Sequence, residues 1–303
     1  MRHPPHVVST GRRPRRIAGA LAGGTARVAV PTAQGASDGD RASARRGALW
    51  LAGEPPAGLP AGQQADVMVA LRLTGTPPAA LRTRLRSLTK AAPAYADTAG
   101  AAAKVVMGAV AAGADPAHLG GIDYLARIRT ASPRPGRYGT SSFDQALSMI
   151  ALRTATGRVP GAAATTLITL RSGPGWNLGL TRSAPPDVDS TALSVVALRA
   201  AGTACSSAVI REARAWLASR RTRGGWTVYP GTGPNANSTA LVARADIACG
   251  QAATGALGVI RSLQDRSGAI RYTAGDPESR MLATADAVPA LVGASLARGL
   301  NPG

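Results

Sequence analysis

The sequence predicts an all-α protein made of repeated helix pairs, with one helix of each pair in an inner ring and the other in an outer ring. Residues 187–202 (DVDSTALSVVALRAAG) begin with capping residues, continue with small apolar residues and end at glycine, as a short buried helix does. Related sequences recur at residues 143–152 and 235–243. Strand signals are scarce, because neither alternating patterns nor runs of aromatic and β-branched residues persist. The chain is therefore expected to consist of copies of one helical unit.

An alanine near the start of each inner helix measures the length of this unit. Most of the sequence distances between successive alanines are about 46 residues, a period that is typical of helix pairs or of propeller blades. Six units follow from this register. The alanines are Ala65, Ala99, Ala146, Ala192, Ala240 and Ala285.

The second half of the unit favours a helix pair over a propeller blade. Residues 208–219 (AVIREARAWLAS) have apolar side chains at helical spacing and charged side chains between them. The first helix of the unit is apolar nearly all round. We therefore expect an inner helix buried on all sides and an outer helix with one face in solvent.

Each unit ends with a tail of glycine followed by an aromatic residue. Glycine permits a sharp turn, and the flat ring packs against the end of a helix to set the crossing to the next unit. Six such units can close into a ring, although an open superhelix is the alternative. The tails are residues 136–139, 175–177, 224–226 and 268–272.

The start of the chain differs from the repeats. Residues 12–16 are basic, residues 17–30 are mostly small and apolar, and residues 33–35 supply small side chains for cleavage. The segment 1–36 is interpreted as a secretory signal or, alternatively, as a disordered basic leader.

The repeat domain is expected to span residues 37–303. It opens with a helical piece at residues 45–52, which Pro55 and Pro56 end. No apolar run reaches the roughly 18 residues that a membrane-spanning helix needs.

The chain is strongly basic, with 35 Lys and Arg against 16 Asp and Glu. Nearly all of these cations are arginines, and they are scattered through every segment rather than clustered among aromatic residues. This distribution does not indicate a nucleic-acid partner. Biased codon usage is an alternative explanation of the arginine content.

Two cysteines, Cys205 and Cys249, follow corresponding helices of adjacent repeats. Neighbouring helices of such an array run side by side, so the two thiols are expected to reach bridging distance, a Cα separation of roughly 4.4–6.8 Å. A disulfide would accord with a secreted protein, and reduced core thiols are the alternative. No metal site is expected, because a closed zinc site needs four ligands and the chain has 3 histidines.

The helix pair, the Asp-Val-Asp-Ser-Thr-Ala helix start at residue 187 and the Gly-Gly-Trp tail ending at Trp226 resemble the prenyltransferase and squalene-cyclase repeat. The resemblance covers residues 45–296 and implies the α/α-toroid fold. Proteins of this superfamily include terpene cyclases, protein prenyltransferase β subunits, cobalamin carriers and thioester-containing complement proteins. The fold alone therefore leaves the function open.

Residues 187–190 match three of the four positions of the Asp-x-Asp-Asp motif of class II terpene cyclases. The resemblance implies that Asp189 is the acid that protonates an alkene, with Asp187 beside it. In the simpler interpretation, these carboxylates cap the helix by accepting hydrogen bonds from unpaired backbone N–H groups.

The same helix starts are expected to surround one mouth of the toroid cavity and to present polar groups to a ligand. Residues 95–100 also resemble helix starts of the cobalamin carriers, which are secreted and not enzymes. The leading hypothesis is therefore a secreted or surface protein that binds cobalamin or a hydrophobic small molecule, without another cofactor and with a second protein chain as a further partner. The alternatives are a terpene-cyclase-like enzyme and a structural protein-interaction domain. The candidate ligand-binding residues are Asp97, Asp144, Asp189, Asn235 and Asn237.

Overall fold

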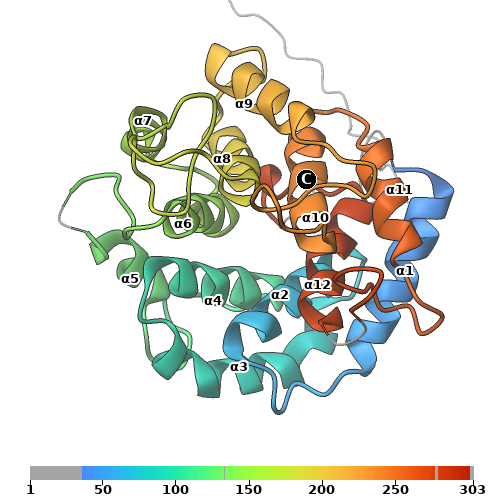
Figure 1. The fold of residues 1–303 in the computed structure, drawn as a ribbon. Helices are drawn as coiled ribbons and strands as arrows, with labels where there is room; N and C mark the ends of the chain where they lie inside the picture. Colours follow the sequence, from blue (N-terminus) through green and yellow to red (C-terminus); the bar gives the residue numbers. More distant parts are fainter. Residues whose placement is uncertain (1–35, 133, 277–278, 301–303) are drawn as a thin grey trace, which may run out of the picture. The chain divides into compact units, whose positions relative to one another are not determined.

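A computed structural model describes residues 36–132, 134–276 and 279–300. Within these ranges the chain forms twelve α-helices and two short 3-10 helices, and its β-bridges are isolated ones (Figure 1). Contacts between Cα atoms place these described residues in one compact unit. The expected leader, residues 1–36, lies outside the described residues except for Ala36.

The even-numbered helices form a closed inner ring. Each one contacts the two inner helices on either side, and α12 contacts α2, so the first and last repeats meet. This closure confirms the predicted α/α toroid and shows that the open superhelix is wrong. The inner helices are α2 (Ala61–Leu73), α4 (Ala99–Ala111), α6 (Ser142–Thr156), α8 (Val188–Ala200), α10 (Ala236–Ala248) and α12 (Arg280–Leu291).

The odd-numbered helices lie around this ring, each packed against the inner helix that precedes it in the ring (Figure 1). In α9, the buried residues Ile210, Ala213 and Leu217 follow helical spacing, as the amphipathic pattern predicts. The helical piece expected at residues 45–52 is the second half of α1. The outer helices are α1 (Asp38–Gly53), α3 (Arg82–Tyr95), α5 (Tyr124–Thr130), α7 (Gly161–Thr169), α9 (Ala208–Ser219) and α11 (Thr254–Ser262).

The glycine-aromatic tails join outer helices to the next inner helix through hydrogen bonds. The indole N–H groups of Trp176 and Trp226 donate to the carbonyls of Leu167 and Leu217, both at 2.7 Å. The backbone N–H groups of the same tryptophans donate to threonine hydroxyls on α8 and α10, at 3.0 and 3.1 Å. In the last tail the equivalent backbone donor belongs to Ile270, so this residue takes the place that the sequence assigned to Tyr272.

The alanines that mark the repeat occupy corresponding positions in their inner helices, except in α4. Ala146, Ala192 and Ala240 are each the fifth residue after the N-cap of their helix, and in α4 this position is Ala103. Ala99 is the first helical residue, one turn too early. Several alanines follow one another in α4, so the sequence pattern does not distinguish between successive turns.

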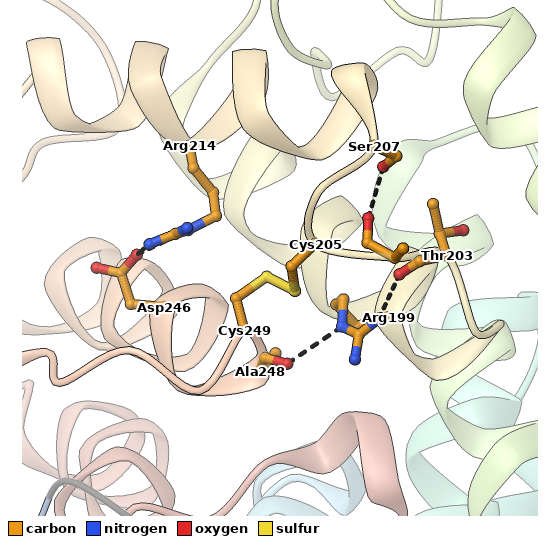
Figure 2. The surroundings of a disulfide bond; sticks show 9 residues. Arg199, Thr203, Cys205, Ser207, Arg214, Asp246, Ala248 and Cys249 are labelled. Carbon is orange, nitrogen blue, oxygen red and sulfur yellow. Dashed lines mark hydrogen bonds and ion pairs between the residues drawn. A yellow bond between two sulfur atoms is a disulfide. The ribbon is translucent and has the colours of Figure 1, made fainter.

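A disulfide joins Cys205 and Cys249 at the C-terminal ends of α8 and α10, with the two Cα atoms 5.7 Å apart (Figure 2). Arg199 of α8 donates hydrogen bonds to the carbonyls of Thr203 and Ala248 beside it, so it also links the two helix ends (Figure 2).

The C-terminal segment covers this end of the ring. The 3-10 helix η2 (Leu296–Arg298) contacts α6, α8 and α10, and Leu296 and Leu300 are buried. The C-terminal segment thus packs against α6, α8 and α10 at this end of the ring, and the N-terminal ends of the inner helices lie at the opposite mouth.

Candidate functional site

We call the N-terminal ends of the inner helices the inner mouth. The inner helices are otherwise buried, but each exposes a polar or apolar side chain on one face of its first two turns. A helical residue recurs on the same face after three or four positions, so these side chains form one lining. The lining includes Asp66 of α2, Lys104 of α4, Phe143 and Leu147 of α6, Asp189 of α8, Asn237 of α10 and Asp286 of α12.

One ion pair spans α2 and α4 at this mouth. The Nζ atom of Lys104 lies 2.6 Å from Oδ2 of Asp66, and both side chains are largely buried. Burial lowers the pKa of Lys104, but the Asp66 carboxylate outweighs burial, so the pKa of Lys104 is raised overall. Lys104 therefore stays charged, and its charge is balanced within the protein.

A second polar group spans α10 and α12. Asn237 donates a hydrogen bond to Asp286 at 2.7 Å, and a guanidinium nitrogen of Arg244 lies 3.6 Å from the other carboxylate oxygen. Arg244 is 7% exposed, and its Nε atom has no partner among the described residues. Burial lowers the pKa of Arg244, and the carboxylates of Asp286 and Asp66 oppose this effect.

Asp189 stands apart from these pairs. Burial raises the pKa of Asp189 from 3.8 to about 6, the hydroxyl of Ser238 acts in the opposite direction, and the carboxylates of Asp187 and Asp286 raise the pKa further. The Oδ1 atom of Asp189 is buried and has no hydrogen-bond partner in the described part of the chain. This carboxyl group can take up or release a proton near neutral pH.

A pocket of about 490 Å³ opens at the mouth between α4 and α6. Asp144 and Gly100 define part of its wall, because Oδ1 of Asp144 accepts a hydrogen bond from the Gly100 N–H group at 2.9 Å. A second pocket of about 470 Å³ shares Asp97, Thr98 and Asp144 with it and extends toward Arg127. The first pocket is lined by Ala94, Tyr95, Asp97, Thr98, Gly100, Ala101, Lys104, Phe143, Asp144 and Leu147.

The structure divides the predicted site residues into two groups. Asp97 and Asp144 line the pocket, while Asp189 and Asn237 lie on neighbouring inner helices at the same mouth. Asp144 also completes a capping box with Ser141.

Asp187 and Asn235 cap α8 and α10, which is the capping alternative stated for these helix starts. Oδ1 of Asp187 accepts from the Ser190 N–H group at 2.7 Å, and Oδ1 of Asn235 accepts from the Ser238 N–H group at 2.9 Å. Both capping side chains are buried, so they are committed to starting their helices.

Sequence reasoning missed Asp66, Lys104, Arg244 and Asp286. Each is a charged residue within an otherwise apolar inner helix, and that contrast is the signal that points to them. Their pairing was not visible, because it depends on which inner helices become neighbours.

No group of three or more His, Cys, Asp or Glu side chains in the described ranges has an arrangement that suits a metal ion. None of the helices described has the length and apolar character that crossing a bilayer requires.

The ring of helix pairs makes this chain an α/α-toroid protein. No protein-family model matches the sequence, and no curated protein is significantly similar to it. Solved structures with the same fold include a variant of the type II terpene cyclase MstE from Scytonema, with a TM-score of 0.59, 16% identity and coverage of 84% of this chain and 97% of that one.

Two further similar structures contain ligands. One is an MstE variant in complex with geranylgeranyl dihydroxybenzoate, with a TM-score of 0.56, 16% identity and coverage of 84% of this chain and 97% of that one. The other is a glycosidase in complex with glucose, with a TM-score of 0.52, 14% identity and coverage of 84% and 96%. At these identities the similarity concerns the fold.

Proposed function

We propose that this protein binds a small organic molecule at the inner mouth without changing it chemically. The observation that carries the proposal is the pocket of about 490 Å³ whose wall combines charged, aromatic and aliphatic side chains. Pockets for small ligands typically have volumes of roughly 300–1,000 Å³ and such a mixed lining. Because the pocket is lined by the N-terminal parts of α4 and α6, the ligand is proposed to enter through the mouth.

The lining of the inner mouth, which extends beyond the pocket itself, has a polar side and an apolar side. The paired charges of α2, α4, α10 and α12 form the polar side, whereas Phe143 and Leu147 of α6 form the apolar side. An amphipathic molecule suits this division, since its apolar body leaves water while its polar group keeps hydrogen-bond partners.

Secretion or display at the cell surface is part of the proposal. It is supported by the signal-like leader and by the disulfide between Cys205 and Cys249, because disulfides persist in oxidising compartments. N-terminal sequencing of the exported protein tests it. An uncleaved protein that stays inside the cell would contradict this part alone.

The binding experiment uses the purified full chain and a panel of cobalamin, geranylgeraniol and glucose, followed by thermal shift and by NMR of the mouth residues. A ligand at 100 times its dissociation constant stabilises the native state by about 2.7 kcal/mol. Phe143→Ala is expected to weaken binding, and Leu49→Ala, an exposed residue of α1, is the matched control. If no small molecule shifts the melting temperature or the resonances, the alternative of a protein-interaction domain with a second chain as partner gains support.

A terpene-cyclase-like enzyme is the second candidate, favoured by the raised pKa and the unpartnered Oδ1 of Asp189. It ranks second because a carboxyl group with a pKa of about 6 is mostly ionised at pH 7, whereas alkene protonation needs the neutral acid. Incubation with geranylgeranyl substrates, followed by mass spectrometry, tests it. Cyclised product that disappears with Asp189→Asn would establish catalysis and overturn the binding proposal.

A further inference from the structure

We propose that the ligand of the mouth pocket is an organic cation, an amine or quaternary ammonium attached to an apolar body. This inference rests on the proposed binding function and adds the charge of the ligand.

The inner mouth concentrates negative charge in a protein whose formal net charge is +19. Two carboxylates, those of Asp97 and Asp144, line the pocket directly. The cation in its wall, Lys104, is already paired with Asp66 at 2.6 Å. Arg127 lines the adjoining second pocket, where it donates to the Ala96 carbonyl at 3.0 Å and forms no ion pair with either carboxylate among the described residues. The first pocket therefore presents two carboxylates that have no ion-pair partner in its own lining.

The two carboxylates differ in how they are held. Asp144 accepts hydrogen bonds from the N–H groups of Gly100 and Ser141 and from the Ser141 hydroxyl, so its position is fixed. The side chain of Asp97 is exposed and makes no hydrogen bond or ion pair with any residue in the described ranges. Its oxygens are free to accept the hydrogen bonds of an ammonium group.

The helix N-terminus beside the pocket does not offer a free site for an anion. Backbone N–H groups at a helix start usually attract negative ligands. In α4, however, the Gly100 N–H group donates to Asp144 and the Ala101 N–H group donates to Thr98 at 3.1 Å. These donors are satisfied within the protein, so an anionic ligand would meet carboxylates rather than donors.

The rest of the lining suits the apolar and π-facing parts of such a cation. Tyr95 and Phe143 are aromatic, and Ala94, Ala101 and Leu147 are aliphatic. Aromatic faces attract ammonium groups, by about 0.5–1 kcal/mol at exposed sites and more when the cation is desolvated. Two carboxylates and two rings around one pocket are thus the recognition chemistry of an organic cation.

The test compares three probes that share one apolar body and differ in charge: phenethylammonium, 2-phenylethanol and phenylacetate. Each is titrated into the isotopically labelled full chain up to about 10 mM, and binding is measured from the resonances of the mouth residues. We expect phenethylammonium to bind about tenfold more tightly than the alcohol. Asp97→Asn is expected to remove most of this preference, and the melting temperature of the variant verifies that it folds.

Asp115→Asn is the matched control, because Asp115 is an exposed carboxylate beyond the C-terminal end of α4. It is expected to leave the charge preference unchanged. Higher salt should weaken phenethylammonium binding and leave 2-phenylethanol binding unaltered.

Equal binding of the alcohol and the cation, tighter binding of phenylacetate, or an unchanged preference in Asp97→Asn would overturn the cation inference while the binding function stands. Binding of a neutral molecule from the first panel without any binding of phenethylammonium would do the same. If neither the panel nor the three probes bind, both proposals fall.

Discussion

Replacing Asp189 with asparagine is expected to stabilise the protein above pH 6 and to leave its stability unchanged near pH 4. Burial raises the pKa of this carboxyl from 3.8 to about 6, so the native state holds the Asp189 proton more tightly than the unfolded state does. Native stability therefore falls as pH rises from about 4 to 6, and the loss persists at higher pH. An asparagine side chain cannot ionise, so the variant does not undergo this loss.

The magnitude follows from the size of the shift. A rise from 3.8 to about 6 corresponds to about 3 kcal/mol at pH 7.5. Because Asp189 is partly exposed and screened by water, about 2 kcal/mol is the expected gain. With an unfolding entropy of about 2.1 cal/mol/K per residue over 303 residues, this gain raises the melting temperature by about 3 °C.

Calorimetry of both proteins from pH 4 to pH 8 measures the effect. The difference in melting temperature should grow through pH 5 and 6 and then level off. Asp38→Asn is the control, since this side chain is 99% exposed on α1, and it should change the melting temperature by about 1 °C or less. A variant that is less stable than the original at pH 7.5, or a difference that does not vary with pH, would refute the burial argument.

Three further substitutions test other parts of the fold. Replacing Cys205 and Cys249 together by serine should lower the free energy of unfolding by about 4 kcal/mol, because the disulfide closes a loop with a sequence separation of 44. Equal urea midpoints for the variant and the oxidised protein would contradict this. Gly100→Ala should cost about 1–3 kcal/mol, because the new Cβ atom would lie 2.7 Å from Oδ1 of Asp144. The control is Gly258→Ala, whose new Cβ atom would meet no atom within 4 Å. This control should be neutral or stabilising in the same urea experiment. Trp226→Phe should cost about 0.5–1.5 kcal/mol by removing the indole hydrogen bond to the Leu217 carbonyl, which keeps only the bond from the Arg220 N–H group at 3.1 Å; the comparison is Trp216→Phe, on the outer helix α9, and equal losses in the two variants would argue against the indole hydrogen bond.

Local features of the chain could be predicted because their causes lie within a few residues. Thr98, Asp187 and Asn235 each cap the helix that directly follows, with acceptor and donor three residues apart. The tail tryptophans directly follow the glycines of their turns, so their places in the repeat were also visible. The error at Ala99 arose where this local information is ambiguous, in an alanine-rich helix.

The candidate site was only partly visible in the sequence. Asp97 and Asp144 were found because they stand at helix starts, and Asp189 and Asn237 for the same reason. Helix-start patterns do not distinguish a capping carboxylate from one that faces the mouth. That distinction depends on side-chain direction and on the neighbouring helix, which is why the side chains of Asp187 and Asp189 have different surroundings despite being two residues apart.

The sequence by itself determined the helix pair, its repetition, the caps and the burial of the inner helices, because periodicity and capping act over one or two turns. Tertiary structure alone decided that α12 meets α2, that η2 covers one end of the ring and that Lys104 pairs with Asp66. These contacts join residues that are far apart along the chain. Their geometry depends on the crossing angles summed around six repeats, and no local pattern of residues encodes that sum.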